Sequence, residues 1–160
     1  MLLDCLNPSE KIYVSSKARL DPQSSETFES QIDRKLDNSL KRLKLDQLNL
    51  YQLHNKITLE KGSETLTEKE VLEANGLAEI MLKLKEDQRV QNIGITALGD
   101  TNSIKNVLET GYFDTAQVYY NLLNPSVEFE EADAWNDHDF SGLISAVSYT
   151  HLRAHETKPN

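Results

Sequence analysis

Two basic side chains stand at the ends of predicted strands, where they could take part in catalysis. His54 directly follows the apolar run 48–53, which contains no Gly or Pro and is typical of a buried strand. Lys17 ends another β-rich segment, residues 12–16. In α/β barrels the active site lies at the carboxyl ends of the parallel strands, so both residues are candidates for a catalytic role. The alternative is structural, because lysines at strand ends are usually solvated and histidines are usually packed or hydrogen-bonded.

Helices and strands alternate around these two residues. Apolar side chains recur every three or four positions in residues 26–43, which predicts an amphipathic helix with Ser24 or Ser25 as its N-cap. Thr67 and Glu70 fit a capping box that opens a second helix. In chain order we predict a helical end at residues 1–6, strand 12–16, helix 26–43, strand 48–53, polar loop 56–66, a helix from 67 to beyond Leu84, strand 90–96, a helix capped by Asp100 or Thr101 and ended by Gly111, strand 113–120, loop 121–139 and a helical segment 140–147.

This alternation predicts the fold class. Strands that alternate with helices form parallel sheets with right-handed crossovers. Four strand–helix units are half of an eight-unit barrel, so the predicted fold is α/β, a partial (β/α)8 TIM barrel. An open, doubly wound sheet is the alternative. Against a dinucleotide-binding open sheet, no predicted strand is followed by G-x-G-x-x-G, and the chain has no G-x-x-x-x-G-K-[ST] phosphate-binding loop.

Length and composition exclude several classes of protein. The 160 residues are enough for one domain, and 26 acidic against 17 basic residues argue against a nucleic-acid surface. The single cysteine, Cys5, excludes an internal disulfide and a Cys-rich zinc site, and it suits a reducing, cytoplasmic compartment. No apolar stretch approaches the ~18 residues of a membrane span, and residues 1–6 are too short and too acidic for a signal peptide.

Four motifs, taken in order, resemble those of the aldo/keto reductases. They are Ile12-Tyr13-Val14-Ser15-Ser16-Lys17, then Ser39-Leu40-Lys41-Arg42-Leu43 running into Leu50-Tyr51-Gln52-Leu53-His54, then Ile93-Gly94-Ile95-Thr96, and finally Phe113-Asp114-Thr115-Ala116-Gln117-Val118-Tyr119-Tyr120-Asn121. Their spacings suit strands three to six of the family's (β/α)8 barrel, and the resemblance covers roughly residues 1–147. Residues 96–100 and 120–125 look like the bacterial-type members rather than the mammalian aldose reductases. We therefore expect residues 1–147 to form part of an NADP-dependent oxidoreductase domain.

The resemblance also implies a reaction. Such enzymes pass hydride from NADPH to an aldehyde or ketone carbonyl while a tyrosine hydroxyl gives the oxygen a proton. Lys17 and His54 match the family's catalytic lysine and histidine. A nearby ammonium lowers the pKa of the tyrosine, and a neutral imidazole can donate a hydrogen bond to the carbonyl oxygen. Tyr51 is not the expected proton donor, because a residue three positions from His54 in a strand points to the opposite face.

The expected cofactor is NADP(H), again from the resemblance. Thr96 falls where the family usually has a serine that hydrogen-bonds the carboxamide of the nicotinamide, and Gln117 matches the glutamine that completes this site. Ala97 takes the place of the usual asparagine, which removes one amide contact. The expected partner is a small carbonyl substrate, with no nucleic acid, membrane or metal.

Other parts of the family's active site fall outside the matched segment. The catalytic Asp and Tyr are expected upstream of Met1, and the phosphate-binding loops beyond Val147. We therefore expect a fragment of a reductase that has no turnover in this 160-residue form. The alternative is a non-catalytic half-barrel that acts by association with a partner chain or with itself, because exposed strand edges invite pairing.

The end of the chain departs from the family pattern. Residues 148–160 are polar and are predicted to be a non-native or disordered tail. His151 and His155 have the i, i+4 spacing of a metal pair on a helix but lack a third ligand nearby. The acidic stretch 133–139 is interpreted as a solvated loop rather than as a cation site.

Overall fold

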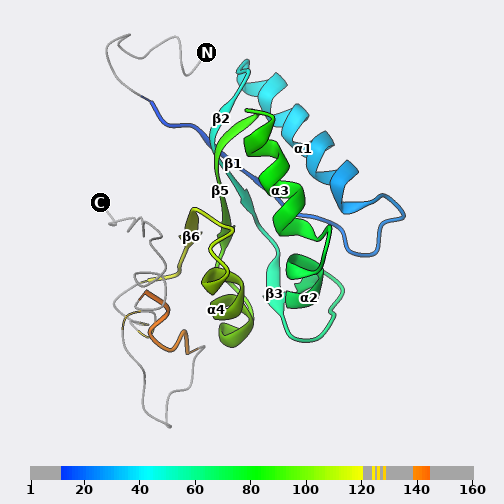
Figure 1. The fold of residues 1–160 in the computed structure, drawn as a ribbon. Coiled ribbons are helices and arrows are strands. Elements are labelled where there is room, and N and C mark those ends of the chain that lie inside the picture. Colours follow the sequence, from blue (N-terminus) through cyan, green and yellow to red (C-terminus); the bar gives the residue numbers. More distant parts are fainter. Residues whose placement is uncertain (1–11, 121–123, 125, 127, 129–138, 145–160) are drawn as a thin grey trace.

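A parallel sheet of four strands, in the order β1-β2-β5-β6, is the central element of the structure (Figure 1). The computed structural model describes residues 12–120, 124, 126, 128 and 139–144. The strands of this sheet are β1 (Ser15–Ala18), β2 (Leu48–Leu53), β5 (Val90–Thr96) and β6 (Thr115–Gln117), and the helices are α1 (Phe28–Leu43), α2 (Glu68–Leu72), α3 (Leu77–Glu86) and α4 (Thr101–Glu109). A second, two-stranded sheet pairs β3 (Lys56–Thr58) with β4 (Thr65–Thr67).

The order of the strands decides between the two predicted architectures. Each strand of the central sheet pairs in parallel with the next one along the chain that belongs to this sheet, and α1 and α3 lie along the same side of it (Figure 1). A doubly wound sheet reverses its strand order at a switch point and carries helices on both faces. A barrel keeps the sequential order and places the helices outside. The described residues therefore confirm the partial barrel and not the open sheet.

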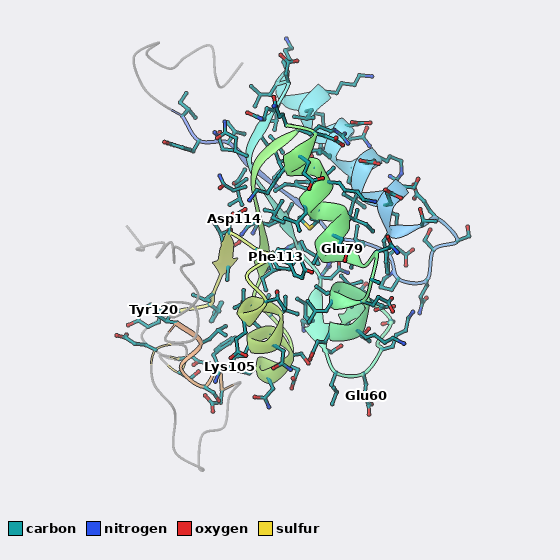
Figure 2. All side chains as sticks on the ribbon, viewed as in Figure 1. Glu60, Glu79, Lys105, Phe113, Asp114 and Tyr120 are labelled. Carbon is teal, nitrogen blue, oxygen red and sulfur yellow. The ribbon has the colours of Figure 1, made fainter. Side chains whose placement is uncertain are left out.

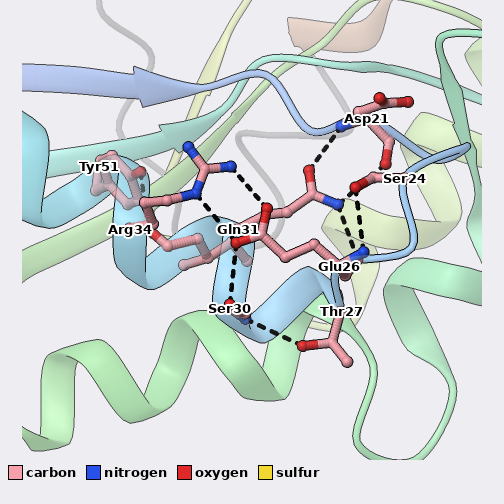
Figure 3. Close-up of polar contacts among 9 residues, drawn as sticks. Asp21, Ser24, Glu26, Thr27, Ser30, Gln31, Arg34 and Tyr51 are labelled. Carbon is pink, nitrogen blue, oxygen red and sulfur yellow. Dashed lines mark hydrogen bonds and ion pairs between the residues drawn. The ribbon is translucent and has the colours of Figure 1, made fainter.

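A hydrogen-bonded cap fixes the start of α1 (Figure 3). Thr27 is the N-cap, and its hydroxyl accepts a hydrogen bond from the backbone N–H of Ser30 at 3.2 Å. The predicted N-cap, Ser24 or Ser25, is therefore wrong. Ser24 Oγ instead accepts a hydrogen bond from the backbone N–H of Glu26, 3.1 Å away in the turn that precedes the helix.

The apolar stripe of α1 packs against the sheet. Ile32 and Leu36 have no exposed surface, and Tyr51 of β2 reaches the same layer, where its hydroxyl donates a hydrogen bond to the backbone oxygen of Ile32 at 3.4 Å. Burial raises the pKa of Tyr51, so the phenol is held in its neutral form. Tyr51 thus faces the helices, which confirms that it points away from the face of β2 that carries the candidate site.

The segment between β2 and β5 differs from the sequence-based expectation in two ways. Residues 56–66, predicted to be a polar loop, contain β3 and begin β4. The capping box at Thr67 and Glu70 is confirmed, but the helix that it opens is interrupted and becomes α2 and α3. Asn75 has a φ of 59°, and a Cβ on Gly76 would meet the backbone oxygen of Glu73 at 2.6 Å. The turn between the helices therefore needs Gly76, and the apolar spacing does not reveal it.

The central strands match the prediction better than the edge strands. The bounds of β2 and β5 agree with the predicted runs 48–53 and 90–96, whereas β1 starts later than predicted and β6 is shorter. Just before β6, the backbone N–H of Asp114 donates to Ile93 O at 2.9 Å, and the Asp114 carboxylate accepts a hydrogen bond from the backbone N–H of Ile93 at 2.8 Å. The ladder between β5 and β6 begins at Thr115. Asp100 is the N-cap of α4, and Gly111 follows the helix with a φ of 72°, both as predicted.

Several predictions lie outside the described residues. They include the helical end at 1–6 with Cys5, most of the loop 121–139, and the tail 148–160. Of the predicted helical segment 140–147, only residues 140–144 are described, and Leu143 and Ile144 are helical. In the described part of the chain, no helix has the length and the apolar character needed to cross a bilayer.

Candidate active site

The register of the sheet places side chains from the four strands in layers. Lys17 is the Cα partner of Gln52, Gln52 of Gly94, and Gly94 of Thr115. Side chains alternate between the two faces of a strand, so these positions share the face opposite to α1 and α3, which we call the inner face. The next layer toward the carboxyl ends holds His54, Thr96 and Gln117, of which the last two are register partners.

The four residues predicted for catalysis and cofactor binding meet in this region as two hydrogen-bonded pairs. His54 Nδ1 lies 3.0 Å from Thr96 Oγ1, and Lys17 Nζ donates a hydrogen bond to Gln117 Oε1. The members of the second pair are 100 positions apart in sequence. The structure therefore brings together all four residues, each from the end of a different strand, as the barrel prediction requires.

His54 is held in its neutral form. Burial lowers the pKa of the imidazole, and the positive charges of Lys17 and Arg19 lower it further. A neutral imidazole carries one N–H. In the tautomer protonated at Nε2, Nδ1 accepts the hydrogen bond from the Thr96 hydroxyl, and Nε2–H remains to donate to a substrate oxygen.

A cavity of about 810 Å³ runs along the inner face. Its lining includes Lys17, Gln52, Thr115 and Gln117, whereas His54 and Thr96 are not part of it. The hydroxyl of Thr115 is buried and has no hydrogen-bond partner within the described part of the chain. An unsatisfied hydroxyl in the wall of a cavity is a group that a polar ligand could satisfy.

Sequence reasoning missed two polar residues of this face. Gln52 is 5% exposed and packs beside Gly94, where a Cβ would lie 3.3 Å from Gln52 Cγ. The sequence could have predicted its position, because Gln52 lies two residues before His54 and therefore points to the same face of the sheet. Thr115 likewise precedes Gln117 by two and shares its face, but only the register with Gly94 shows how closely its hydroxyl packs there. Ala97, at the family's usual asparagine position, is fully buried and its backbone N–H donates to Gln117 O at 2.9 Å.

The position of Gln117 depends on an anchor at the start of its strand. The carboxylate of Asp114 accepts two hydrogen bonds from Lys85 Nζ of α3, both at 2.7 Å, as well as the one from Ile93. Figure 2 shows Asp114 and Phe113 at one end of β6 and Tyr120 beyond the other. Asp114 therefore connects the start of β6 to both α3 and β5. These contacts support the register between β5 and β6 in which Gln117 lies beside Thr96.

The described residues offer no grouping of three or more His, Cys, Asp or Glu side chains that could hold a metal ion. Asp139, at the end of the acidic stretch, uses its carboxylate oxygens for hydrogen bonds with Ser141 N and Ser141 Oγ at 2.7 and 2.9 Å. Asp133, His138, His151 and His155 lie outside the described residues.

Comparison with solved structures finds the same fold. The aldo-keto reductase AKR11C1 from Bacillus halodurans matches with a TM-score of 0.61 and 18% sequence identity, over 89% of this chain and 38% of that one. An aldo/keto reductase from Klebsiella pneumoniae in complex with NADP and acetate gives 0.58 and 21%, over 89% and 41%. A Klebsiella pneumoniae aldo-keto reductase in complex with NADPH gives 0.57 and 21%, over 88% and 40%.

The chain spans about two fifths of the length of these proteins. A comparison with curated protein sequences finds no significant match. The sequence model of the Aldo/keto reductase family matches residues 2–148. This match covers nearly the whole chain, and together with the fold it shows that the chain belongs to the aldo/keto reductase family.

Proposed function

We propose that the chain is part of an NADP(H)-dependent reductase that acts on an aldehyde or ketone carbonyl. The observation that carries the proposal is the meeting of Lys17, His54, Thr96 and Gln117 at the carboxyl ends of four strands. Two of the solved relatives, both from Klebsiella pneumoniae, were crystallised with NADP or NADPH. These relatives support the choice of cofactor for this chain.

The residues present fit the nicotinamide end of such a cofactor. The Thr96 hydroxyl can donate to His54 Nδ1 and still accept a hydrogen bond from a carboxamide NH₂, because a hydroxyl has one donor and two lone pairs. Gln117 accepts from Lys17 through Oε1, which leaves its amide N–H groups for a carboxamide oxygen. Thr115, whose buried hydroxyl has no hydrogen-bond partner in the described residues, lines the same cavity as Gln117.

Two further roles fall to the chain's own basic residues. When bound, the cofactor supplies the hydride that a carbonyl carbon needs. We assign to His54 the orientation of the carbonyl oxygen through its N–H, for which the lowered pKa is suited because the imidazole stays neutral at pH 7. We assign to Lys17 the stabilisation of negative charge beside the carbonyl oxygen.

Nucleotide binding to the 160-residue chain tests the proposal without turnover. In a two-dimensional NMR titration with NADPH, the side-chain amide of Gln117 and the backbone amides near Thr96 should shift. The same titration with 2′-phospho-ADP-ribose, which lacks the nicotinamide, should leave them unchanged. Gln117→Leu should weaken the NADPH response about 3–10-fold, the loss of one hydrogen bond, while Asn102→Ala on the exposed surface of α4 should not.

Equal responses to the two nucleotides would exclude a nicotinamide site on the inner face. No response to either nucleotide at millimolar concentration would contradict the proposed cofactor for this chain.

Self-association is a second candidate function, which we propose on a separate observation. Of the large apolar side chains exposed in the described residues, Ile12 and Tyr13 precede β1, and Tyr119 and Tyr120 follow β6. These are the two edge strands of the sheet, and exposed edges favour pairing with another chain. Sedimentation velocity on the NMR sample distinguishes the two candidates: a monomer that responds to NADPH supports the first, and a dimer that does not supports the second.

A further inference from the structure

Asn55, the residue after His54, is buried and uses its side chain to bind two separate loops. It is 1% exposed. Its Oδ1 accepts a hydrogen bond from the backbone N–H of Leu20 at 2.7 Å, and its Nδ2 donates to the backbone oxygens of Leu20 and Glu64 at 2.8 and 3.0 Å. The loop that follows β1 and the loop between β3 and β4 are therefore both attached to the end of β2.

These contacts place Arg19, one of the two cations that act on His54, whereas Lys17 is held by its pairing with Gln52 and by Gln117. The backbone N–H of His54 donates to Ala18 O at 2.8 Å, and Asn55 holds Leu20. Arg19 lies between these two fixed points, and Lys17 directly precedes them. Arg19 also makes a long ion pair, 3.9 Å, with the exposed carboxylate of Glu64. Residues 18–20 are thus attached to the end of β2 by two adjacent residues. His54 binds Ala18 through its backbone, and Asn55 binds Leu20 through its side-chain amide.

We propose that Asn55 is a positioning residue that keeps Arg19 beside the imidazole of His54. It does not touch the proposed substrate, and its role rests on the proposed function of His54. In the described residues, the charged groups that lower the pKa of His54 are Lys17 in β1 and Arg19 directly after it. The neighbouring strand β5 contributes only the neutral hydroxyl of Thr96. Without the amide of Asn55, the loop after β1 can move away and more water can reach the half-buried imidazole.

Gln31 of α1 offers a matched control. It is also 1% exposed. Its Oε1 accepts from the backbone N–H of Asp21 at 2.8 Å, and its Nε2 donates to the backbone oxygens of Asp21 and Glu26 at 3.0 and 3.1 Å (Figure 3). Asn55 and Gln31 are thus two buried amides that each accept one backbone hydrogen bond and donate two. They hold the adjacent residues Leu20 and Asp21, and only Asn55 adjoins His54.

The experiment is an NMR titration of the imidazole of His54, assigned by comparison with His54→Gln. In the parent chain the midpoint should lie below ~6.5, the pKa of an unperturbed histidine. In Asn55→Leu it should rise toward that value, because the departure of Arg19 and the entry of water both favour the protonated imidazole. In Gln31→Leu it should stay at the parent value, although an equal number of hydrogen bonds is lost.

Asn55→Ser, which keeps one donor and one acceptor, should give an intermediate midpoint and serves where Asn55→Leu does not fold. Equal midpoints in parent and Asn55→Ser, or equal shifts in the Asn55 and Gln31 variants, would overturn the proposal. The titration contains no nucleotide. A chain that fails to bind NADPH can therefore still show the Asn55 effect, and a chain that binds NADPH can lack it, so the two proposals fail separately.

Discussion

The two faces of the same sheet are built from alternate residues of the same strands, and they differ in chemistry. On the face toward α1 and α3, Tyr51, Leu53, Ile93 and Ile95 have no exposed surface. On the inner face, the positions between and after them are Gln52, His54, Gly94 and Thr96. One face supplies the apolar burial that stabilises the fold, and the other carries the polar groups of the candidate site. The two functions are separated because successive side chains of a strand point in opposite directions.

The largest effect should separate Leu53, the last residue of β2, from His54, which follows it. Leu53→Ala leaves a cavity in the apolar layer and should lower the free energy of unfolding by about 2–5 kcal/mol. His54→Gln, one position further and on the other face, should change it by less than about 1 kcal/mol at pH 7.5. Urea unfolding of both variants measures the difference. Similar losses would mean that the two faces contribute equally to stability.

Gly94 is a tightly packed position of the inner face. A Cβ there would lie 2.2 Å from Thr115 Oγ1 and 2.7 Å from Thr115 O. Gly94→Ala should therefore cost about 1–3 kcal/mol of unfolding free energy, as overpacked substitutions do. Adding Thr115→Ala removes the hydroxyl but not the backbone oxygen, so the double variant should recover only part of this loss. A neutral Gly94→Ala variant would show that β5 and β6 can separate without cost.

The smallest effect concerns the pH dependence of stability. Because the folded protein lowers the pKa of His54, the unfolded chain binds a proton more readily at this residue. The contribution of His54 to stability is thus fully present above about pH 6.5 and is lost as the pH falls through the lowered pKa. Urea unfolding between pH 5 and 7.5 should show a steeper loss for the parent than for His54→Gln.

Lys17→Met should reduce that slope, because one of the cations that lower the pKa of His54 is removed, whereas Lys41→Met at the far end of α1 should not. A parent and a His54→Gln variant with parallel profiles would contradict the assigned direction of the pKa shift.

Features that depend on near neighbours in the chain could be predicted from the sequence. The apolar runs defined β2 and β5, the three-to-four-residue spacing defined the buried side of α1, and the spacing of Thr67 and Glu70 defined a helix start. The face of Tyr51 followed from the strand period. Each of these is fixed within a few residues by backbone geometry, which is why the residues alone were sufficient.

Features that join distant segments were decided only by the tertiary structure. The sequence order of the motifs indicated that Lys17, His54, Thr96 and Gln117 share a site, but not that they form the pairs Lys17–Gln117 and His54–Thr96. The loop contacts of Asn55 and the close approach of Thr115 to Gly94 could not be predicted from the sequence either. All of them depend on the register between strands, which is set by the packing of the whole sheet and not by the residues beside each position.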